Sequence, residues 1–156
     1  KGIYTTHSNA AVGTSSAVIG AGLGGKVKII AYDADPQQVR SLFEQGFRIA
    51  GERLACGHFH DTRGLGLANV YAAWQVGVRR FDACLAGIGG CPHAPGASGN
   101  VATEDVAYLF ASMGQPTGVD FSRLIALRAK VAGWLEGESL HGTIARAGLP
   151  KTMAGT

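Results

Sequence analysis

The chain has 156 residues, of which 46% are hydrophobic and 16% charged, and its formal net charge is +3. Disorder requires the opposite balance, so this composition predicts a packed globular protein with a single domain over residues 1–156. The positive residues are dispersed and no apolar run reaches the roughly 18 residues of a membrane helix, so neither a nucleic acid nor a membrane is an expected partner.

Strands and helices alternate along the predicted chain. Short β-branched or apolar runs predict strands at residues 3–6, 27–32, 54–59 and 78–85. Small-residue and amphipathic stretches predict helices at residues 9–21, 36–46, 67–76, 101–113 and 121–135. The order is therefore β-α-β-α-β-α-β-α-α.

Several helix ends carry local signals. Asp35 supplies an N-cap before Pro36, and Gly46 is expected to stop the helix that follows. Asp120 is expected to cap the last helix. The tail over residues 142–156 is polar and rich in glycine, so we expect it to be loosely held.

The alternation predicts an α/β fold with a parallel sheet of about four strands and flanking helices. We expect an open sheet of the flavodoxin or Rossmann type. The alternative is half of a (βα)8 barrel. A half barrel would expose a strand edge and an apolar inner face, which would favour a homodimer.

Candidate ligands for a metal follow the predicted third strand. His58 and His60 lie two residues apart, so on a strand their imidazoles point to the same side and can bind a divalent cation together. The alternative is two polar residues at a strand end without a metal. Asn100 is either an amide-oxygen ligand or the N-cap of the next helix.

Other polar residues and the thiols leave more than one interpretation open. His7 and Asp33 follow the first two strands, where they either bind a polar ligand or form turns. Cys91 lies in the glycine-rich stretch 87–92, either as a reactive group of lowered pKa or as an inert thiol. Cys56 and Cys84 are interpreted as small core residues.

Two features bear on the compartment. Three cysteines cannot all pair, which indicates a reducing environment rather than a disulfide framework. Lys1 leads directly into a strand-like segment, so no signal peptide is expected. The natural location stays unknown, and recombinant expression would give a cytoplasmic protein.

Three stretches together form a specific pattern: GHFHDTRGLGLANV (57–70), GVRRFDACLAGIGGCPHAPGASGNVATEDVAYLF (77–110) and LHGTIARAGLPKTMAG (140–155). Through them, residues 53–153 closely resemble the C-terminal part of hydroxymethylglutaryl-CoA (HMG-CoA) lyase. The resemblance implies a metal-dependent (βα)8 barrel that splits HMG-CoA into acetyl-CoA and acetoacetate.

The same resemblance implies roles for individual residues. His58, His60 and Asn100 would bind the divalent cation, and Cys91 would act in proton transfer, while His93 stands where relatives have Tyr or Phe. The family's aspartate ligand and its adjacent catalytic arginine are not identifiable here. With an incomplete ligand set, we expect no required cofactor and weak binding of Mg²⁺, Mn²⁺, Zn²⁺ or Ni²⁺.

The first part of the chain shows a different pattern. GIYTTHSNAAVGTSSAVIGAGLGGKVKIIAYDADPQQVRSLFEQG (2–46) resembles the late part of periplasmic sugar-binding proteins of ABC transporters. That resemblance implies that His7 and Asp33 help to hold a sugar, although His7 replaces the usual asparagine.

Both resemblances together suggest an engineered or recombined chimera without native catalytic activity. In this interpretation residues 1–46 derive from a sugar-binding protein and residues 47–156 from a lyase. One alternative is an HMG-CoA lyase that is active when another chain supplies the missing ligands. A second alternative is a sugar-binding module, and no small-molecule ligand is established by the sequence.

Overall fold

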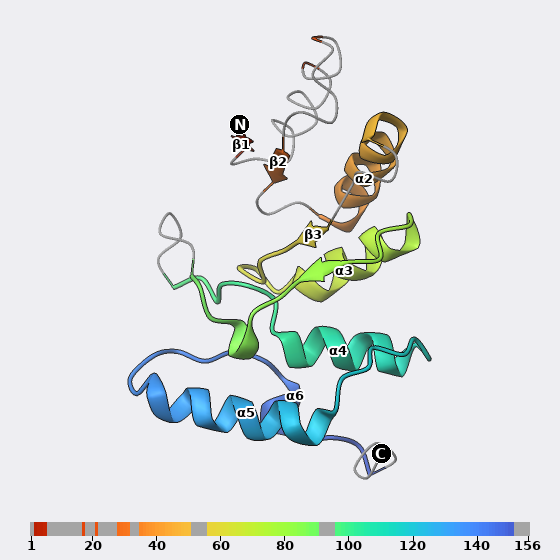
Figure 1. Ribbon diagram of the computed structural model, residues 1–156. Coiled ribbons are helices and arrows are strands. Elements are labelled where there is room, and N and C mark those ends of the chain that lie inside the picture. The colour runs from red at the N-terminus through yellow and green to blue at the C-terminus, as the bar shows by residue number, and fades with distance from the viewer. Residues whose placement is uncertain are drawn as a thin grey trace. The chain divides into compact units, whose positions relative to one another are not determined.

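The computed structural model describes residues 2–5, 17, 21, 28–31, 35–50, 56–90 and 96–151 (Figure 1). The chain divides into two compact units, Lys1–Asp82 and Ala83–Thr156, and each is described by itself. Among the described residues, no helix has both the length and the apolar character that a membrane crossing requires.

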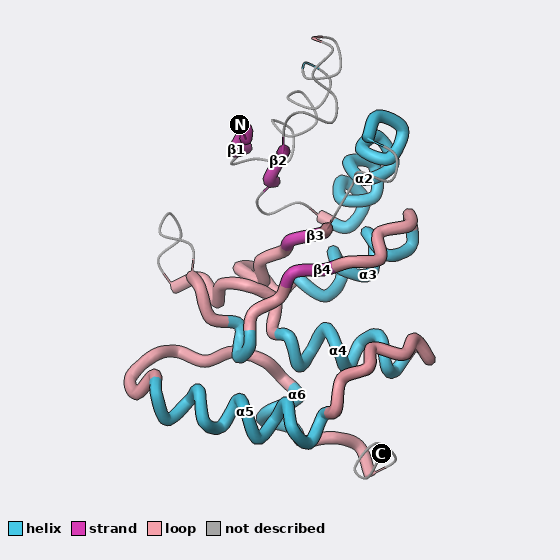
Figure 2. Tube along the Cα trace, viewed as in Figure 1, coloured by secondary structure: helices cyan, strands magenta, loops and turns pink. Residues whose placement is uncertain are grey.

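From β2 onward the first unit alternates strands and helices as predicted, while the helix predicted at residues 9–21 lies outside the described residues except for residues 17 and 21. Its elements are β1 (Gly2–Thr5), β2 (Lys28–Ala31), α2 (Pro36–Ala50), β3 (Gly57–His58), α3 (Gly66–Gln75) and β4 (Phe81–Asp82). The strands are drawn in magenta in Figure 2. Within the described residues they form two separate parallel pairs, β1 with β2 and β3 with β4, where a single sheet of about four strands was expected. The α/β class and the parallel pairing are confirmed.

Helix α2 begins at the predicted N-cap. The Asp35 Oδ1 atom accepts hydrogen bonds from the backbone N–H groups of Gln37 at 2.9 Å and Gln38 at 3.0 Å. In return, the Gln38 Oε1 atom accepts from the Asp35 N–H at 3.2 Å. This reciprocal pair satisfies donors that the first helical turn would otherwise leave unbonded.

The predicted stop at Gly46 is wrong, because α2 continues to Ala50. A glycine inside a helix costs about 1 kcal/mol, but the apolar stripe runs on past it to Phe47. Val39 is buried, the Phe43 ring lies 6.0 Å from the Phe59 ring, and Phe47 packs against Gly77. Full burial of such a side chain stabilises by about 1.5–3 kcal/mol, so the burial of Val39 together with the partial burial of Phe43 and Phe47 outweighs the cost of the glycine.

The second unit is mainly helical in its described residues. It contains the 3-10 turn η2 (Leu85–Gly87), α4 (Thr103–Ser112), α5 (Phe121–Trp134) and α6 (Ile144–Ala147). Its buried apolar residues lie on η2 and around the start of α4, and they are Ala86, Val101, Ala102, Val106 and Ala107. Asp120 caps α5 as predicted, since its Oδ1 atom accepts from the Arg123 N–H at 3.0 Å. A hydrogen bond from the Ser122 hydroxyl, with the Arg123 N–H, lowers the pKa of Asp120.

The start of the tail is held in place, so the expectation of a loose segment from residue 142 is wrong for its described part. The Asp105 carboxylate accepts hydrogen bonds from the Thr143 N–H and hydroxyl, both at 2.8 Å, and from the Ile144 N–H at 2.9 Å. Hydrogen bonds to a charged group are stronger than neutral ones. This buried acid therefore anchors α6 to α4.

Candidate functional site

The two histidines of the predicted metal site lie side by side. The ring centroids of His58 and His60 are 5.3 Å apart, while the intervening Phe59 is buried among Phe43 and Phe81. Alternation along the strand therefore puts the apolar ring in the core and leaves both imidazoles together. This pair offers two nitrogen donors of the kind that divalent transition metals prefer.

A thiol and a carboxylate accompany the histidine pair. The Cys56 Sγ atom donates to Asp82 Oδ1 at 3.2 Å, and Asp82 Oδ2 lies 3.7 Å from His58 Nδ1. Burial, reinforced by the hydrogen bond and the negative charge of Asp82, raises the pKa of Cys56 from 9.0 to about 11. The interpretation of Cys56 as a small core residue misses this polar contact, because Asp82 is 26 positions away in sequence.

The raised pKa predicts that Cys56 reacts slowly with iodoacetamide in the folded chain. At pH 9, a thiol whose pKa is about 11 is ionised roughly fifty times less than one whose pKa is 9.0. The rate of Cys56 alkylation, followed by mass spectrometry, should keep rising between pH 9 and pH 11. Asp82→Asn removes the carboxylate and should shift this profile to lower pH. A wild-type profile that levels off near pH 9 would contradict the prediction.

Asp61, which follows the histidines, has a local structural role. Its Oδ1 atom accepts a hydrogen bond from the Gly66 N–H at 2.7 Å, at the start of α3. The first N–H groups of a helix have no partner within the helix, so this carboxylate satisfies one of them. It also favours the helix by placing a negative charge at its positive end.

Asn100 is not an N-cap, because α4 begins at Thr103 and its cap position is Ala102. The side chain instead holds the glycine-rich segment before it, through hydrogen bonds from Nδ2 to the carbonyl oxygens of Ile88 at 2.9 Å and Gly89 at 3.3 Å. Asn100 is 8% exposed, and within the described part of the chain its buried Oδ1 atom has no hydrogen-bond partner. The amide is thus oriented with its oxygen available to a ligand.

Close contacts explain two of the glycines around Asn100. A Cβ atom at Gly89 would lie 2.7 Å from Asn100 Nδ2. At Gly99, where φ is +91°, a Cβ atom would lie 2.7 Å from the Gly87 carbonyl oxygen. Such distances are below van der Waals contact. Side chains at these positions would therefore separate the two segments that Asn100 joins.

We predict that Gly99→Ala destabilises the second unit much more than Gly118→Ala. Both glycines have positive φ, +91° and +68°, but a Cβ atom at Gly118 meets nothing within 4 Å. The control should lose only the backbone cost of about 1–2 kcal/mol, and Gly99→Ala about 2 kcal/mol more, because backbone must shift. Urea unfolding of the two variants measures the difference. Equal losses of unfolding free energy in the two variants would show that the close contact at Gly99 does not contribute to stability.

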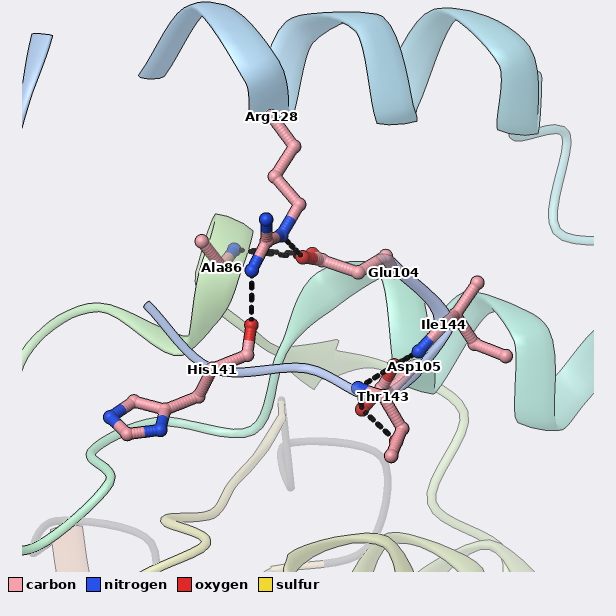
Figure 3. A network of polar contacts seen from close by, with 7 residues as sticks. All are labelled: Ala86, Glu104, Asp105, Arg128, His141, Thr143 and Ile144. Carbon is pink, nitrogen blue, oxygen red and sulfur yellow. Dashed lines mark hydrogen bonds and ion pairs between the residues drawn. The ribbon is translucent and has the colours of Figure 1, made fainter. Parts of the chain in front are cut away.

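A buried ion pair connects distant parts of the second unit (Figure 3). Glu104 is fully buried, and its carboxylate accepts from Arg128 Nε at 2.6 Å and from the Ala86 N–H at 3.2 Å. Arg128 reaches from α5 and also donates to the His141 carbonyl oxygen at 2.8 Å. Ala86 has a positive φ of 58°, which is costly for a residue with a Cβ atom. The pair thus fixes the strained turn that precedes the Gly87–Gly89 segment.

The remaining sequence-predicted site residues, His7, Asp33 and Cys91, lie outside the described residues, as does His93. His58 and His60 belong to the first unit and Asn100 to the second. In the described ranges, no group of three or more His, Cys, Asp or Glu side chains is arranged to hold a metal ion. Taken separately, the two imidazoles of the first unit and the unpaired buried amide oxygen of the second are each of a type that divalent cations bind.

Comparison with known proteins identifies the family. Residues 34–131, more than half of the chain, match the HMGL-like family model, and the chain belongs to this family. The (R)-citramalyl-CoA lyase of Chloroflexus aurantiacus is 52% identical over 94 residues, covering 58% of this chain and 28% of that protein. The HMG-CoA lyase of Pseudomonas mevalonii is 47% identical over 100 residues, covering 64% of this chain and 33% of that protein.

A solved structure extends the comparison to the fold. The HMG-CoA lyase from Acinetobacter baumannii, in complex with coenzyme A and 3-methylmalate, matches with a TM-score of 0.76 at 34% identity. The match covers 96% of this chain and 52% of that chain. The present chain thus spans about a third of its curated relatives and about half of the solved lyase.

These findings support the lyase resemblance and the description as a fragment of a (βα)8 barrel, the stated alternative to an open sheet. The family match begins at residue 34, so it includes part of the segment that was assigned to a sugar-binding protein. The comparisons give no support to the sugar-binding component or to a chimera. The lyase alternative is therefore better supported than the main sequence-based interpretation.

Proposed function

We propose that the chain is part of a metal-dependent lyase that splits HMG-CoA into acetyl-CoA and acetoacetate. The observation that carries this proposal is the state of Asn100 within the family match. Its amide nitrogen donates to two carbonyl groups, and its buried oxygen is an acceptor without a hydrogen-bond partner among the described residues. An unpaired buried polar atom is costly unless a ligand satisfies it.

His58, His60 and Asn100 are the residues that we propose to hold the cation. Two imidazoles and a neutral amide suit several divalent metals, and an anionic ligand from the rest of a complete lyase, or from another chain, would strengthen binding. A bound divalent cation supplies Lewis-acid stabilisation to substrate oxygens on which negative charge develops. The chain's own contribution is to orient these donors.

The cleavage itself requires two proton transfers. A base removes the proton of the tertiary hydroxyl group, the adjacent carbon–carbon bond breaks, and its electron pair moves into the enolate of the thioester. The hydroxyl carbon becomes the ketone of acetoacetate, and protonation of the enolate gives acetyl-CoA. We propose Cys91 as a proton carrier in this sequence, since a thiol on a glycine-rich segment can approach the reacting carbon closely.

A segment exchange tests the proposal. The 100 matching residues of the Pseudomonas mevalonii lyase would be replaced by those of the present chain, and acetoacetate release would be measured with Mg²⁺ or Mn²⁺. We expect turnover within about tenfold of the parent enzyme, and a loss of at least roughly a hundredfold in His58→Ala. Asp120→Asn, a charge change at an exposed helix cap, is the control. A folded but inactive exchange product would refute the proposal.

Citramalyl-CoA is a second candidate substrate, because the citramalyl-CoA lyase of Chloroflexus aurantiacus is 52% identical to this chain in the matched region. The same exchange product would be assayed with both thioesters, and the ratio of kcat/KM values decides between them. A ratio that follows the inserted segment, instead of the parent enzyme, would assign substrate preference to this part of the chain.

The sugar-binding hypothesis stays a prediction for the residues before the family match, which begins at residue 34 and so leaves out His7 and Asp33. An inactive chimera predicts no acetoacetate from HMG-CoA in the exchange experiment. A sugar-binding module predicts heat on calorimetric titration with pentoses or hexoses. Titrations that release or absorb no heat would contradict the sugar-binding hypothesis.

A further inference from the structure

Asp82 and His58 are neighbours across the β3–β4 pair. The two strands run parallel, and the register places His58 directly beside Asp82. Paired residues on adjacent strands project from the same face of a sheet, so their side chains meet without any long-range rearrangement. The contact is therefore built into the strand pairing itself.

The two oxygen atoms of Asp82 have different partners. Oδ1 accepts the hydrogen bond from Cys56 Sγ at 3.2 Å, while Oδ2 lies 3.7 Å from His58 Nδ1. The thiol thus holds one carboxylate oxygen and leaves the other facing the imidazole. A negatively charged oxygen next to Nδ1 favours a proton on that nitrogen, and the lone pair of the neutral ring is then on Nε2.

We propose that Asp82 is a positioning residue that keeps His58 protonated at Nδ1, so that Nε2 is the atom offered to a divalent cation. Cys56 supports this arrangement by holding the carboxylate. A cation on Nε2 would make the ring more positive and draw Nδ1–H closer to Asp82, since outer carboxylates strengthen histidine ligands in this way. The cation-binding part of the inference rests on the proposed function, whereas the protonated nitrogen is a property of the metal-free chain.

The contact is not chiefly a stabilising ion pair. The side chains of His58 and Asp82 are 42% and 66% exposed, so water screens their attraction. Replacing Asp82 should accordingly leave the urea midpoint almost unchanged. The expected effect is on the orientation and tautomer of one imidazole, which separates positioning from a general structural role.

The test is ¹⁵N NMR of the histidine side chains in the full chain at about pH 8. The His58 signals would be assigned by their loss in His58→Gln. We expect Nδ1–H in the wild-type chain and a shift toward Nε2–H in Asp82→Asn. Asp120→Asn, which removes the same charge elsewhere, should change nothing. An Nε2–H tautomer in the wild type, or no response to Asp82→Asn, would overturn the inference.

Calorimetric titration with Zn²⁺ alone provides the second measurement. Asp82→Asn should weaken binding by tenfold to a hundredfold, and Asp120→Asn should leave it unchanged. Equal affinity in wild type and Asp82→Asn would count against the positioning role. If the wild-type chain binds no Zn²⁺ while the tautomer responds as expected, the proposed cation site fails and the role of Asp82 in fixing the imidazole stands.

Discussion

Replacement of Glu104 by alanine should destabilise the second unit by about 3–5 kcal/mol, because it leaves the guanidinium group of Arg128 without its acidic partner. The carboxylate is fully buried, lies 2.6 Å from Arg128 Nε and also accepts the Ala86 N–H. The variant would leave a largely buried charge and a buried backbone donor uncompensated. Urea unfolding of the second unit's helices, followed by circular dichroism, measures the loss.

A double-mutant cycle separates the ion pair from the packing around it. Arg128→Met alone should also be strongly destabilising, because it leaves the buried Glu104 carboxylate without its positively charged partner. Glu104→Leu combined with Arg128→Met should cost much less than the sum of the losses in the two single variants. Glu138→Ala, at an exposed position, is the control and should stay within about 0.5 kcal/mol of wild type. A loss below about 1 kcal/mol in Glu104→Ala would mean that the pair contributes little.

Replacement of Asn100 by aspartate should make the second unit less stable without a cation and more responsive to one. The new oxygen would face the carbonyl groups of Ile88 and Gly89, which now accept hydrogen bonds from Nδ2. A buried carboxylate without donors is expected to cost about 3–5 kcal/mol. Because carboxylates are good ligands, Mn²⁺ or Zn²⁺ should recover part of this loss.

Asn100→Ala is the comparison for this second prediction. It removes the two hydrogen bonds as well, but it provides no oxygen, so a cation should not restore its stability. The measurement is the urea midpoint of each variant with and without 1 mM metal. If Asn100→Asp and Asn100→Ala respond equally to the cation, the side-chain oxygen at this position is not a ligand.

Features that depend on neighbouring residues were predictable from the sequence. Asp35 and Asp120 cap the helices that follow them, because an N-cap bonds to groups two or three residues away. His58 and His60 lie together because side chains alternate along a strand. Each of these features depends on residues only a few positions apart, and the tertiary contacts of the folded chain do not alter it.

Features that depend on tertiary contacts were missed. Gly46 does not end α2, because packing of Phe47 outweighs local helix propensity. Of the two alternatives for Asn100, the helix cap is wrong, because its hydrogen bonds run back to residues 11 and 12 positions earlier. The contact between Glu104 and Arg128 spans 24 positions, and no local pattern marks either residue as a partner.

The contacts of Asp105 also bear on how the second unit is made. Its carboxylate accepts hydrogen bonds from Thr143 and Ile144, which follow it by 38 and 39 positions in the sequence. Arg128 donates to the carbonyl group of His141, which also comes later in the chain. During synthesis on the ribosome, α4 therefore emerges with its acidic first turn still hydrated. Thr143 and Ile144, at the start of α6, must leave the exit tunnel before those charges can be buried. We expect this half of the molecule to fold in one late, cooperative step, so that truncation before Thr143 leaves α4 and α5 without a common core.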